Sequence, residues 1–150
     1  MTDVRKDQFI LFLVAGTTYA LPSHNVAHVE MVEHVTKVPN APAFVDGVVL
    51  SRGQVVPAVN MRARFGFERV DAGMKARLLV TQSRGRSVGL LVDECREFLL
   101  IPSTSIQPPG EALAGVAARY VTGIATLGDR LIVVLNLDEL LDSAEPILAA

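Results

Sequence analysis

The stretch that decides the fold is residues 44–60, which read FVDGVVLSRGQVVPAVN. Two apolar runs rich in valine, residues 48–50 and 55–59, flank the polar tetrad SRGQ. β-Branched residues favour strands, and a short polar tetrad that contains glycine favours a turn, so the stretch predicts a β-hairpin. Gly53 can adopt a positive φ without steric cost, and this places Arg52 at an exposed tip.

The second strand of this hairpin contains Pro57. Proline has no N–H for the ladder, so we expect an edge strand or a bulge there. A hairpin tip with one fixed cation suits recognition. It does not suit catalysis, because it brings neither a base nor a nucleophile.

The rest of the chain consists of short apolar segments between turn signals. Further strands are expected at residues 9–15, 19–21, 29–38, 78–81, 87–92, 97–101, 120–127 and 131–136, and short helical turns at 25–28, 61–65 and 138–141. The polar residues 1–8 are expected to be frayed. Many short strands at regular spacing favour small barrels or sandwiches, so the fold class is all-β.

The hairpin has an echo later in the chain. Residues 44–48 (FVDGV) correspond to 120–124 (YVTGI) at an offset of 76, and the same offset relates Asn60 to Asn136. Residues 19–21 correspond to 88–90 at an offset of 69. We infer two related β-lobes that bury apolar faces against each other, since each is too small for a full core.

The expected lobes are residues 9–70 and 76–142, with a polar connector at 68–75 between them. The basic residues of this region alternate with Glu68 and Asp71 and are expected to be solvated: Arg62, Arg64, Arg69, Lys75 and Arg77. The chain is then one domain built from two lobes.

Composition excludes several function classes. Fourteen basic and sixteen acidic residues are interspersed and give a net charge of −2, which argues against a nucleic-acid interface. The chain has no tryptophan, which disfavours stacking platforms for single strands. Half the residues are hydrophobic, and a surplus of apolar surface usually serves an interface.

Location follows from the same data. The single cysteine, Cys95, excludes an intramolecular disulfide and suits a reducing cytoplasm. The apolar run 9–15 is too short to span a bilayer, and Asp3 and Asp7 do not fit the cationic flank of a signal peptide. We therefore expect a cytoplasmic protein without membrane insertion.

Candidates for chemistry are few. His24 and His28 stand four residues apart, as metal ligands on a helix can, but no third ligand lies nearby, so no metal or cofactor is expected. Cys95 has no evident base or oxyanion donor and is interpreted as a small, partly buried apolar residue. Two alternatives stay open: a thiol enzyme that uses Cys95 with a low thiol pKa, and a β-scaffold that dimerises through one lobe.

Five motifs follow one another along the chain: VPNAPAFVDGV at 38–48, RGQVVP at 52–57, VGLLVD at 88–93, YVTG at 120–123 and GDR at 128–130. Together, and in this order, they resemble the CheW family. The resemblance covers residues 9–142.

The resemblance implies a cytoplasmic adaptor of two packed five-stranded SH3-like barrels without catalytic activity. Such adaptors couple the histidine kinase CheA to methyl-accepting chemoreceptors. One lobe pairs with the regulatory domain of the kinase, and the groove between the lobes takes the receptor's helical hairpin tip. The positions that match partner-binding positions of the family are Val26, His28, Arg52 and Gly53, together with Gly89 and Phe98 for the receptor-facing groove.

The chain departs from the family pattern at three places. Leu50 and Ser51 precede the Arg-Gly pair, His28 stands where a glutamate is common, and Glu94-Cys95 follow Asp93. These departures bear on partner choice. They leave a second reading open, an adaptor of a paralogous chemosensory system that controls surface motility or second-messenger output.

Overall fold

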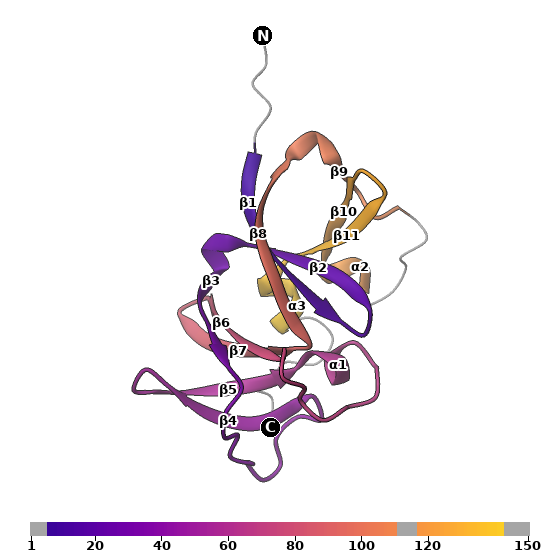
Figure 1. Cartoon of the computed structure of the whole chain (residues 1–150). Coiled ribbons are helices and arrows are strands. Elements are labelled where there is room, and N and C mark those ends of the chain that lie inside the picture. The colour runs from indigo at the N-terminus through magenta and orange to yellow at the C-terminus, as the bar shows by residue number, and fades with distance from the viewer. Residues whose placement is uncertain (1–5, 111–116, 143–150) are drawn as a thin grey trace.

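The protein consists of two curved β-sheets, which the computed structural model shows for residues 6–110 and 117–142 (Figure 1). In order across the first sheet, the strands are β8 (Glu94–Pro102), β1 (Lys6–Val14), β2 (Thr17–Pro22), β11 (Arg130–Leu135), β10 (Val121–Leu127) and β9 (Ile106–Gln107). In order across the second sheet, they are β3 (Val26–Met31), β6 (Arg77–Ser83), β7 (Arg86–Val92), β5 (Gln54–Asn60) and β4 (Val45–Ser51).

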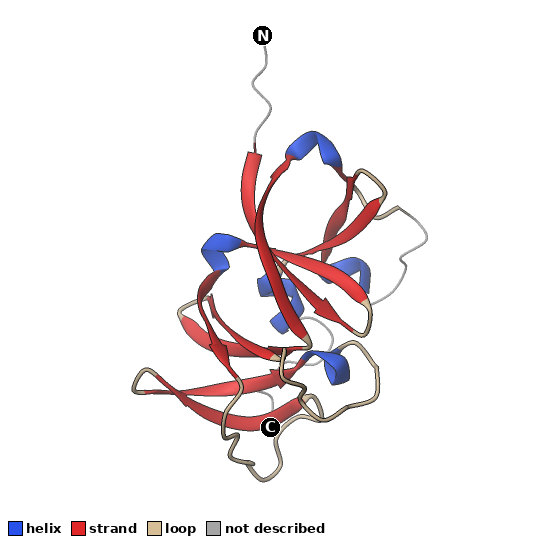
Figure 2. Cartoon of the chain, viewed as in Figure 1, coloured by secondary structure: helices blue, strands red, loops and turns tan. Residues whose placement is uncertain are grey.

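In the described residues, helical structure is confined to short turns between the strands and after β11 (Figure 2). These are η1 (Ser23–Asn25), α1 (Met61–Arg64), η2 (Ser103–Ser105), α2 (Ala117–Tyr120) and α3 (Leu137–Asp142). The predicted all-β class with short helical turns is confirmed. The first sheet has six strands where five were expected, because the two residues of β9 also pair with β10.

The structure corrects the expectation that residues 1–8 form a frayed end. β1 begins at Lys6, which pairs with Pro102 of β8, so residues 6–8 belong to a strand and are not a frayed end. Residues 1–5 of the segment expected to be frayed lie outside the described residues.

The strand pairing overturns the expected lobe boundaries at 9–70 and 76–142. The β1–β2 hairpin joins the sheet of the second half, since β1 pairs with β8 and β2 runs parallel to β11. The β6–β7 hairpin joins the sheet of the first half, where β6 pairs with β3 and β7 runs parallel to β5. Each half therefore exchanges its first hairpin with the other. Parallel strands need a long crossover, and pairing of neighbours in sequence could not reveal it.

The internal echo is confirmed at the level of register. In one sheet Ala20 pairs with Val134, and in the other Gly89 pairs with Ala58. The offsets of 69 and 76 residues carry the first pair onto the second. The two parallel pairings are thus copies of one arrangement.

The glycine that both copies of the repeat share is required for steric reasons. Gly47 and Gly123 both lie at register shifts of their hairpins. A Cβ at Gly47 would overlap the carbonyl oxygen of Thr36, and one at Gly123 would lie 2.5 Å from that of Gln107. Both glycines are required because a neighbouring backbone crosses at that point.

The largest core lies between the sheets. It takes the inward faces of β1 and β2 from one sheet and of β5, β6 and β7 from the other, and it is closed by residues of α1 and α3. Its fully buried members include Ile10, Phe12, Leu21, Val59, Met61, Leu79, Leu90 and Leu140. Each sheet curls into a barrel, and one smaller cluster of buried residues fills the interior of each. Most of the burial that fixes the fold therefore depends on contact between the sheets.

Arg64 binds residues of both halves at this junction, whereas the sequence analysis expected its side chain to be solvated. Its guanidinium lies 5.2 Å from the ring centroid of Phe44 and 5.4 Å from that of Tyr120, the aromatic residues that begin the two copies of the repeat. It also donates to the carbonyl oxygen of Leu140 at 2.9 and 3.2 Å. Cation–π contacts of this kind contribute about 0.5–2 kcal/mol each.

Asp93 forms a second contact across this junction. Arg62 donates to its carboxylate at 2.8, 3.0 and 3.1 Å, and the backbone N–H of Ala15 donates at 2.8 Å. Burial opposes ionisation of this carboxyl, but the hydrogen bonds from Arg62 and Ala15 outweigh it, and the pKa of Asp93 lies below its ordinary value. These hydrogen bonds join three parts of the fold: Ala15 lies in the β1–β2 turn, Asp93 connects β7 with β8, and Arg62 belongs to α1.

The exchange of hairpins predicts that neither half folds alone. We expect residues 1–75 and 76–150, expressed separately, to give amide NMR spectra without dispersion, because each half contains a hairpin whose partner strands lie in the other. Mixing the two halves is expected to restore dispersion. A well-dispersed spectrum from either isolated half would contradict the exchanged pairing.

Candidate protein–protein interface

The β4–β5 hairpin projects beyond its sheet as an arm, defined here as residues 50–57 (Figure 1). β5 was expected at an edge or with a bulge at Pro57, but it lies between β4 and β7. Its pairing with β7 begins only at Ala58, one residue after Pro57, so the residue without an N–H lies where no ladder is needed. Within the arm, β4 and β5 therefore pair only with each other.

The tip of the arm carries Arg52 and Gly53, as the sequence predicts. Both residues are exposed and both have positive φ, +48° for Arg52 and +81° for Gly53. Among residues 6–110 and 117–142, no acidic side chain pairs with Arg52. The turn fixes the backbone of Arg52, and the exposed guanidinium remains available to a partner.

Two apolar side chains flank this cation. Leu50 and Val55 face each other across the hairpin and are 75% and 70% exposed. Sequence reasoning missed them, although the alternation with the buried Val49 and Val56 carries the signal. An exposed apolar pair beside an arginine has the composition of an interface centre.

His28 belongs to the root of the arm. Its Nε2 lies 2.9 Å from the hydroxyl of Ser51 and 3.1 Å from the carboxylate of Glu30, and Ser51 also donates to Glu30. These bonds join the outer strands β3 and β4, and a bridge between Val48 of β4 and Thr36, which follows β3 in the chain, lies on the same side of the sheet. His28 therefore closes the second barrel and sets the direction of the arm.

The same three groups do not form a catalytic triad. A serine nucleophile needs a histidine whose second ring nitrogen is bound by the carboxylate. Here the hydroxyl and the carboxylate contact the same nitrogen of His28, so no separate group orients the ring.

Val26 and Gly89 lie beneath the surface that the sequence assigned to them. Val26 is half-buried and packs against the inter-sheet core. Gly89 is buried in β7, where a Cβ would lie 2.6 Å from Leu78 Cδ1. In this structure both residues shape the scaffold, and a partner would sense them only through their neighbours.

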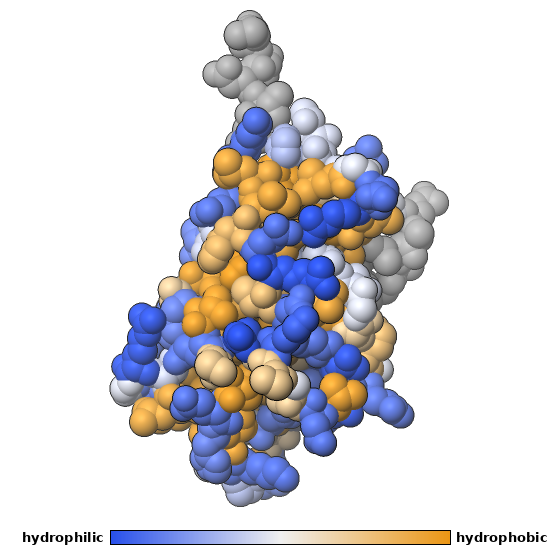
Figure 3. Space-filling model, in the orientation of Figure 1, coloured by the Kyte–Doolittle hydropathy of each residue, from blue (hydrophilic) through white to orange (hydrophobic). Residues whose placement is uncertain are grey.

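Phe98 lies on the other sheet, at the outer strand β8, and is 55% exposed. Leu100 shares its face of the strand, as residues two apart do, and is 58% exposed. Apolar surface gathers over this part of the first sheet in Figure 3. Phe98 and Leu100 are defined here as the β8 patch. Four of the six predicted positions thus lie in the arm, at its root or in this patch, and the other two, Val26 and Gly89, lie in the scaffold.

The chemistry that the sequence left open finds little support. The described part of the chain contains no cluster of three or more histidine, cysteine or acidic side chains placed to hold a metal ion. Burial raises the pKa of Cys95, with Glu94 adding to the effect and Arg77 opposing it, whereas a thiol nucleophile needs a lowered pKa. Among the described helices, none has the length and apolar character needed to cross a membrane.

Two related barrels with exposed apolar and cationic side chains define the class of a protein-binding module. The family model of the CheW-like domain matches residues 8–145, and the chain therefore belongs to the CheW family. The resemblance drawn from the motifs is confirmed.

Individual relatives cover most of the chain. The chemotaxis protein CheW of Helicobacter pylori is 31% identical over 134 residues, covering 89% of this chain and 81% of that protein. Protein FrzA of Myxococcus xanthus is 29% identical over 142 residues, covering 93% and 88%. The crystal structure of the scaffolding protein TtCheW from Thermoanaerobacter tengcongensis superposes with a TM-score of 0.86 at 26% identity, over 96% of this chain and 98% of that one.

The raised pKa of Cys95 makes a chemical prediction. At neutral pH the native thiol is expected to react with iodoacetamide more slowly than N-acetylcysteine does, since a smaller fraction of it is thiolate. Mass spectrometry of the alkylated protein measures the rate, and the urea-unfolded protein is the control for an intact thiol. Rapid, stoichiometric alkylation of the native protein would instead favour the thiol-enzyme alternative.

Proposed function

We propose that this protein is a non-catalytic adaptor that couples a CheA-type histidine kinase to methyl-accepting chemoreceptors in the cytoplasm. The observation that carries the proposal is the match to the CheW-like domain over residues 8–145, with the two-barrel scaffold intact. The solved relative is described as a scaffolding protein, which agrees with a role in assembly.

The arm is assigned to the kinase. Its partner is a regulatory domain that resembles this fold, and the arm offers an apolar pair around one cation. Leu50 and Val55 supply surface that gains from leaving water, while Arg52 supplies orientation through a carboxylate of the partner. His28 and Ser51 act indirectly, because they hold the root of the arm.

The β8 patch is assigned to the receptor. The helical hairpin at a receptor tip presents apolar residues at helical spacing, and it needs an exposed apolar surface in return. Phe98 and Leu100 provide such a surface on a strand paired with β1, whose opposite side is packed in the core. A different sheet carries each contact, so one molecule can bind both partners at once.

Charge reversal at the tip tests the kinase contact. Arg52→Glu is expected to raise the Kd for the kinase regulatory domain by about tenfold or more, because it removes the cation and repels its partner. Binding is measured by sedimentation or isothermal titration calorimetry. The melting temperature should stay within about 2 °C of the parent protein, since an exposed side chain is changed.

Arg84→Glu is the matched control. Arg84 also precedes a glycine at a hairpin tip with positive φ, but on β6–β7, where it pairs with Asp142. It should leave kinase binding unchanged. Equal losses of affinity in both variants, or an equal loss of thermal stability in Arg52→Glu, would contradict the assignment of the arm.

Truncation in the β8 patch tests the receptor contact. Phe98→Ala combined with Leu100→Ala should weaken binding of a receptor tip fragment by at least tenfold and leave kinase binding unchanged. Leu131→Ala is the control, because Leu131 is an exposed leucine of the same sheet on another strand. Unchanged receptor binding by the double variant would place the receptor elsewhere.

A second candidate pathway follows from one relative. The identity to FrzA over nearly the whole chain equals that to some CheW proteins, which leaves room for a paralogous chemosensory system. Deletion of the gene in its own host separates the two. Loss of flagellar chemotaxis supports the first pathway, and a defect confined to surface motility or second-messenger output supports the second.

A further inference from the structure

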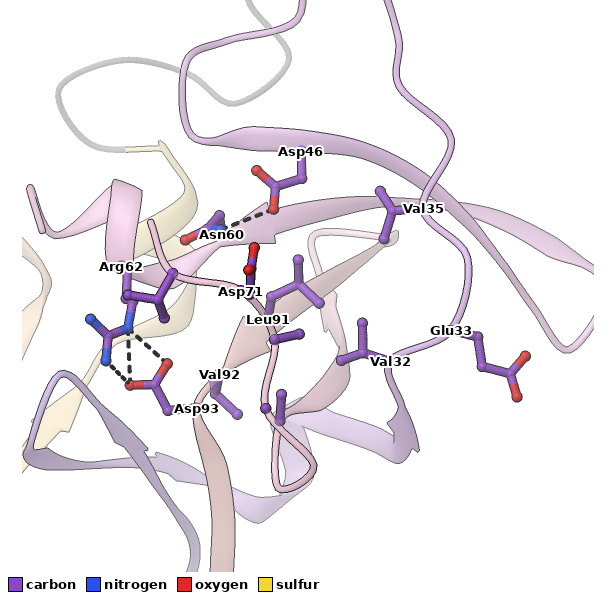
Figure 4. Close-up of a pocket in the computed structure, with 14 residues that line it drawn as sticks. Val32, Glu33, Val35, Asp46, Asn60, Arg62, Asp71, Leu91, Val92 and Asp93 are labelled. Atoms are coloured by element: carbon purple, nitrogen blue, oxygen red, sulfur yellow. Dashed lines mark hydrogen bonds and ion pairs between the residues drawn. The ribbon is translucent and has the colours of Figure 1, made fainter. Parts of the chain in front are cut away.

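A cavity of about 520 Å³ lies in the second barrel, away from the arm and the β8 patch (Figure 4). Its walls come from the segment 32–35 after β3, from residues 70–76 of the connector and its end, and from the end of β7, with single residues of β4, β5 and α1. The lining residues are Val32, Glu33, Val35, Asp46, Asn60, Arg62, Val70, Asp71, Ala72, Gly73, Ala76, Leu91, Val92 and Asp93. The volume lies in the range of sites that bind small molecules.

One part of the lining is apolar. Leu91 and Val92 come from the end of β7, and Val32 and Val35 face the cavity from the segment after β3. Val70 of the connector adds an exposed valine, and Met74 is exposed in the same connector. A ligand therefore gains by bringing an aliphatic body into this cavity.

The charged part of the lining is acidic. It contains four carboxylates, Glu33, Asp46, Asp71 and Asp93, against one guanidinium, that of Arg62. Arg62 is already bound to Asp93 through three short contacts, and the side-chain amide of Asn60 donates to Asp46 at 2.9 Å. Both side-chain donors of the lining thus already bind a carboxylate, and the excess of carboxylates over guanidinium disfavours an anion.

Asp71 is a carboxylate of the lining that is not paired with a cation in the described part of the chain. Within residues 6–110 and 117–142 it has neither an ion pair nor a hydrogen bond, whereas Asp46 is paired with Arg69 and Asp93 with Arg62. Glu33 points away from the other labelled side chains in Figure 4. An acceptor without a cation beside an apolar wall is complementary to a chain of carbon atoms that ends in a positive charge.

We propose that this cavity binds an organic cation, an aliphatic chain with a terminal ammonium or guanidinium, with Asp71 as the carboxylate that receives the charge. The site is independent of the kinase and receptor contacts, because it shares no residue with the arm or the β8 patch.

The test uses three five-carbon probes that differ only in their head group: n-pentylamine, n-pentanol and pentanoate. Amide chemical shifts of the full chain are followed by NMR during titration. Pentylamine should bind at least tenfold more tightly than either other probe, and the largest shifts should fall on residues 70–73 and 91–93. The proposal is overturned if pentylamine causes no saturable shifts there, or if pentanol or pentanoate binds as tightly.

Asp71→Asn tests the role of the carboxylate. It should weaken pentylamine binding by about tenfold and leave pentanol binding unchanged, since only the charge is removed. Glu68→Gln is the control, because Glu68 lies in the same connector but does not line the cavity. Equal effects of the two variants, or no effect of Asp71→Asn, would contradict the assignment, and thermal unfolding verifies that both variants are folded.

The cation can be a free amine or a lysine side chain of a partner protein. Nα-acetyl-lysine methylamide carries the same head group on a capped backbone and distinguishes the two sources. Binding at least as tight as that of pentylamine assigns the site to a partner's side chain. Weaker binding assigns it to a free amine.

Discussion

The exchange of hairpins between the two halves is the constraint on which the structure depends. β1–β2 and β6–β7 each complete a sheet begun by the other half of the chain, and their inner faces meet in the largest core. Neither barrel could be removed without taking strands from the other. The arm and the β8 patch are consequently held at a fixed distance by one continuous core and not by a linker.

The residues at the centre of this exchange explain features that look unrelated in sequence. Arg64 lies between Phe44 and Tyr120, which are equivalent positions of the repeat, and it donates to Leu140, its own equivalent at the offset of 76. Such contacts between equivalent residues are expected near an approximate twofold axis. Repeat copies diverge most freely away from that axis. Arg52 lies at such a place, and its departure from the second copy can serve a partner without cost to the scaffold.

Local signals in the sequence were sufficient for the hairpins, the repeat and the fold class. Turn chemistry placed Arg52 and Gly53 at a tip, and the echo at residues 120–124 gave the second copy of that hairpin. The family motifs supplied the class of function. Pairing between distant strands was beyond reach, because period and propensity indicate that a strand exists but not which strand lies beside it.

The residues of the candidate site also divide into those that local sequence patterns indicate and those that only the structure brings together. Leu50 and Val55 were readable from alternation alone, whereas the contact of His28 with Ser51 joins residues from separate strands and needed the structure. Gly89 shows the opposite case. The sequence assigned it to a partner-binding position, but burial against Leu78 gives it a packing role in the structure. Positions marked by a motif thus include residues that shape a surface as well as residues that form it.

The parallel pairing of β2 with β11 has a consequence for how the protein is made. Tyr19 and Val133 are among the paired residues, so the apolar β1–β2 hairpin leaves the ribosome long before its partner strand. At about 5–20 residues per second, more than 100 residues of further synthesis take roughly 5–20 s. During that interval Phe9 and Leu11 lack the side chains of β11, Ile132 and Val134, with which they form a buried cluster. A nascent chain of this family is therefore a natural client for chaperones that bind extended apolar segments.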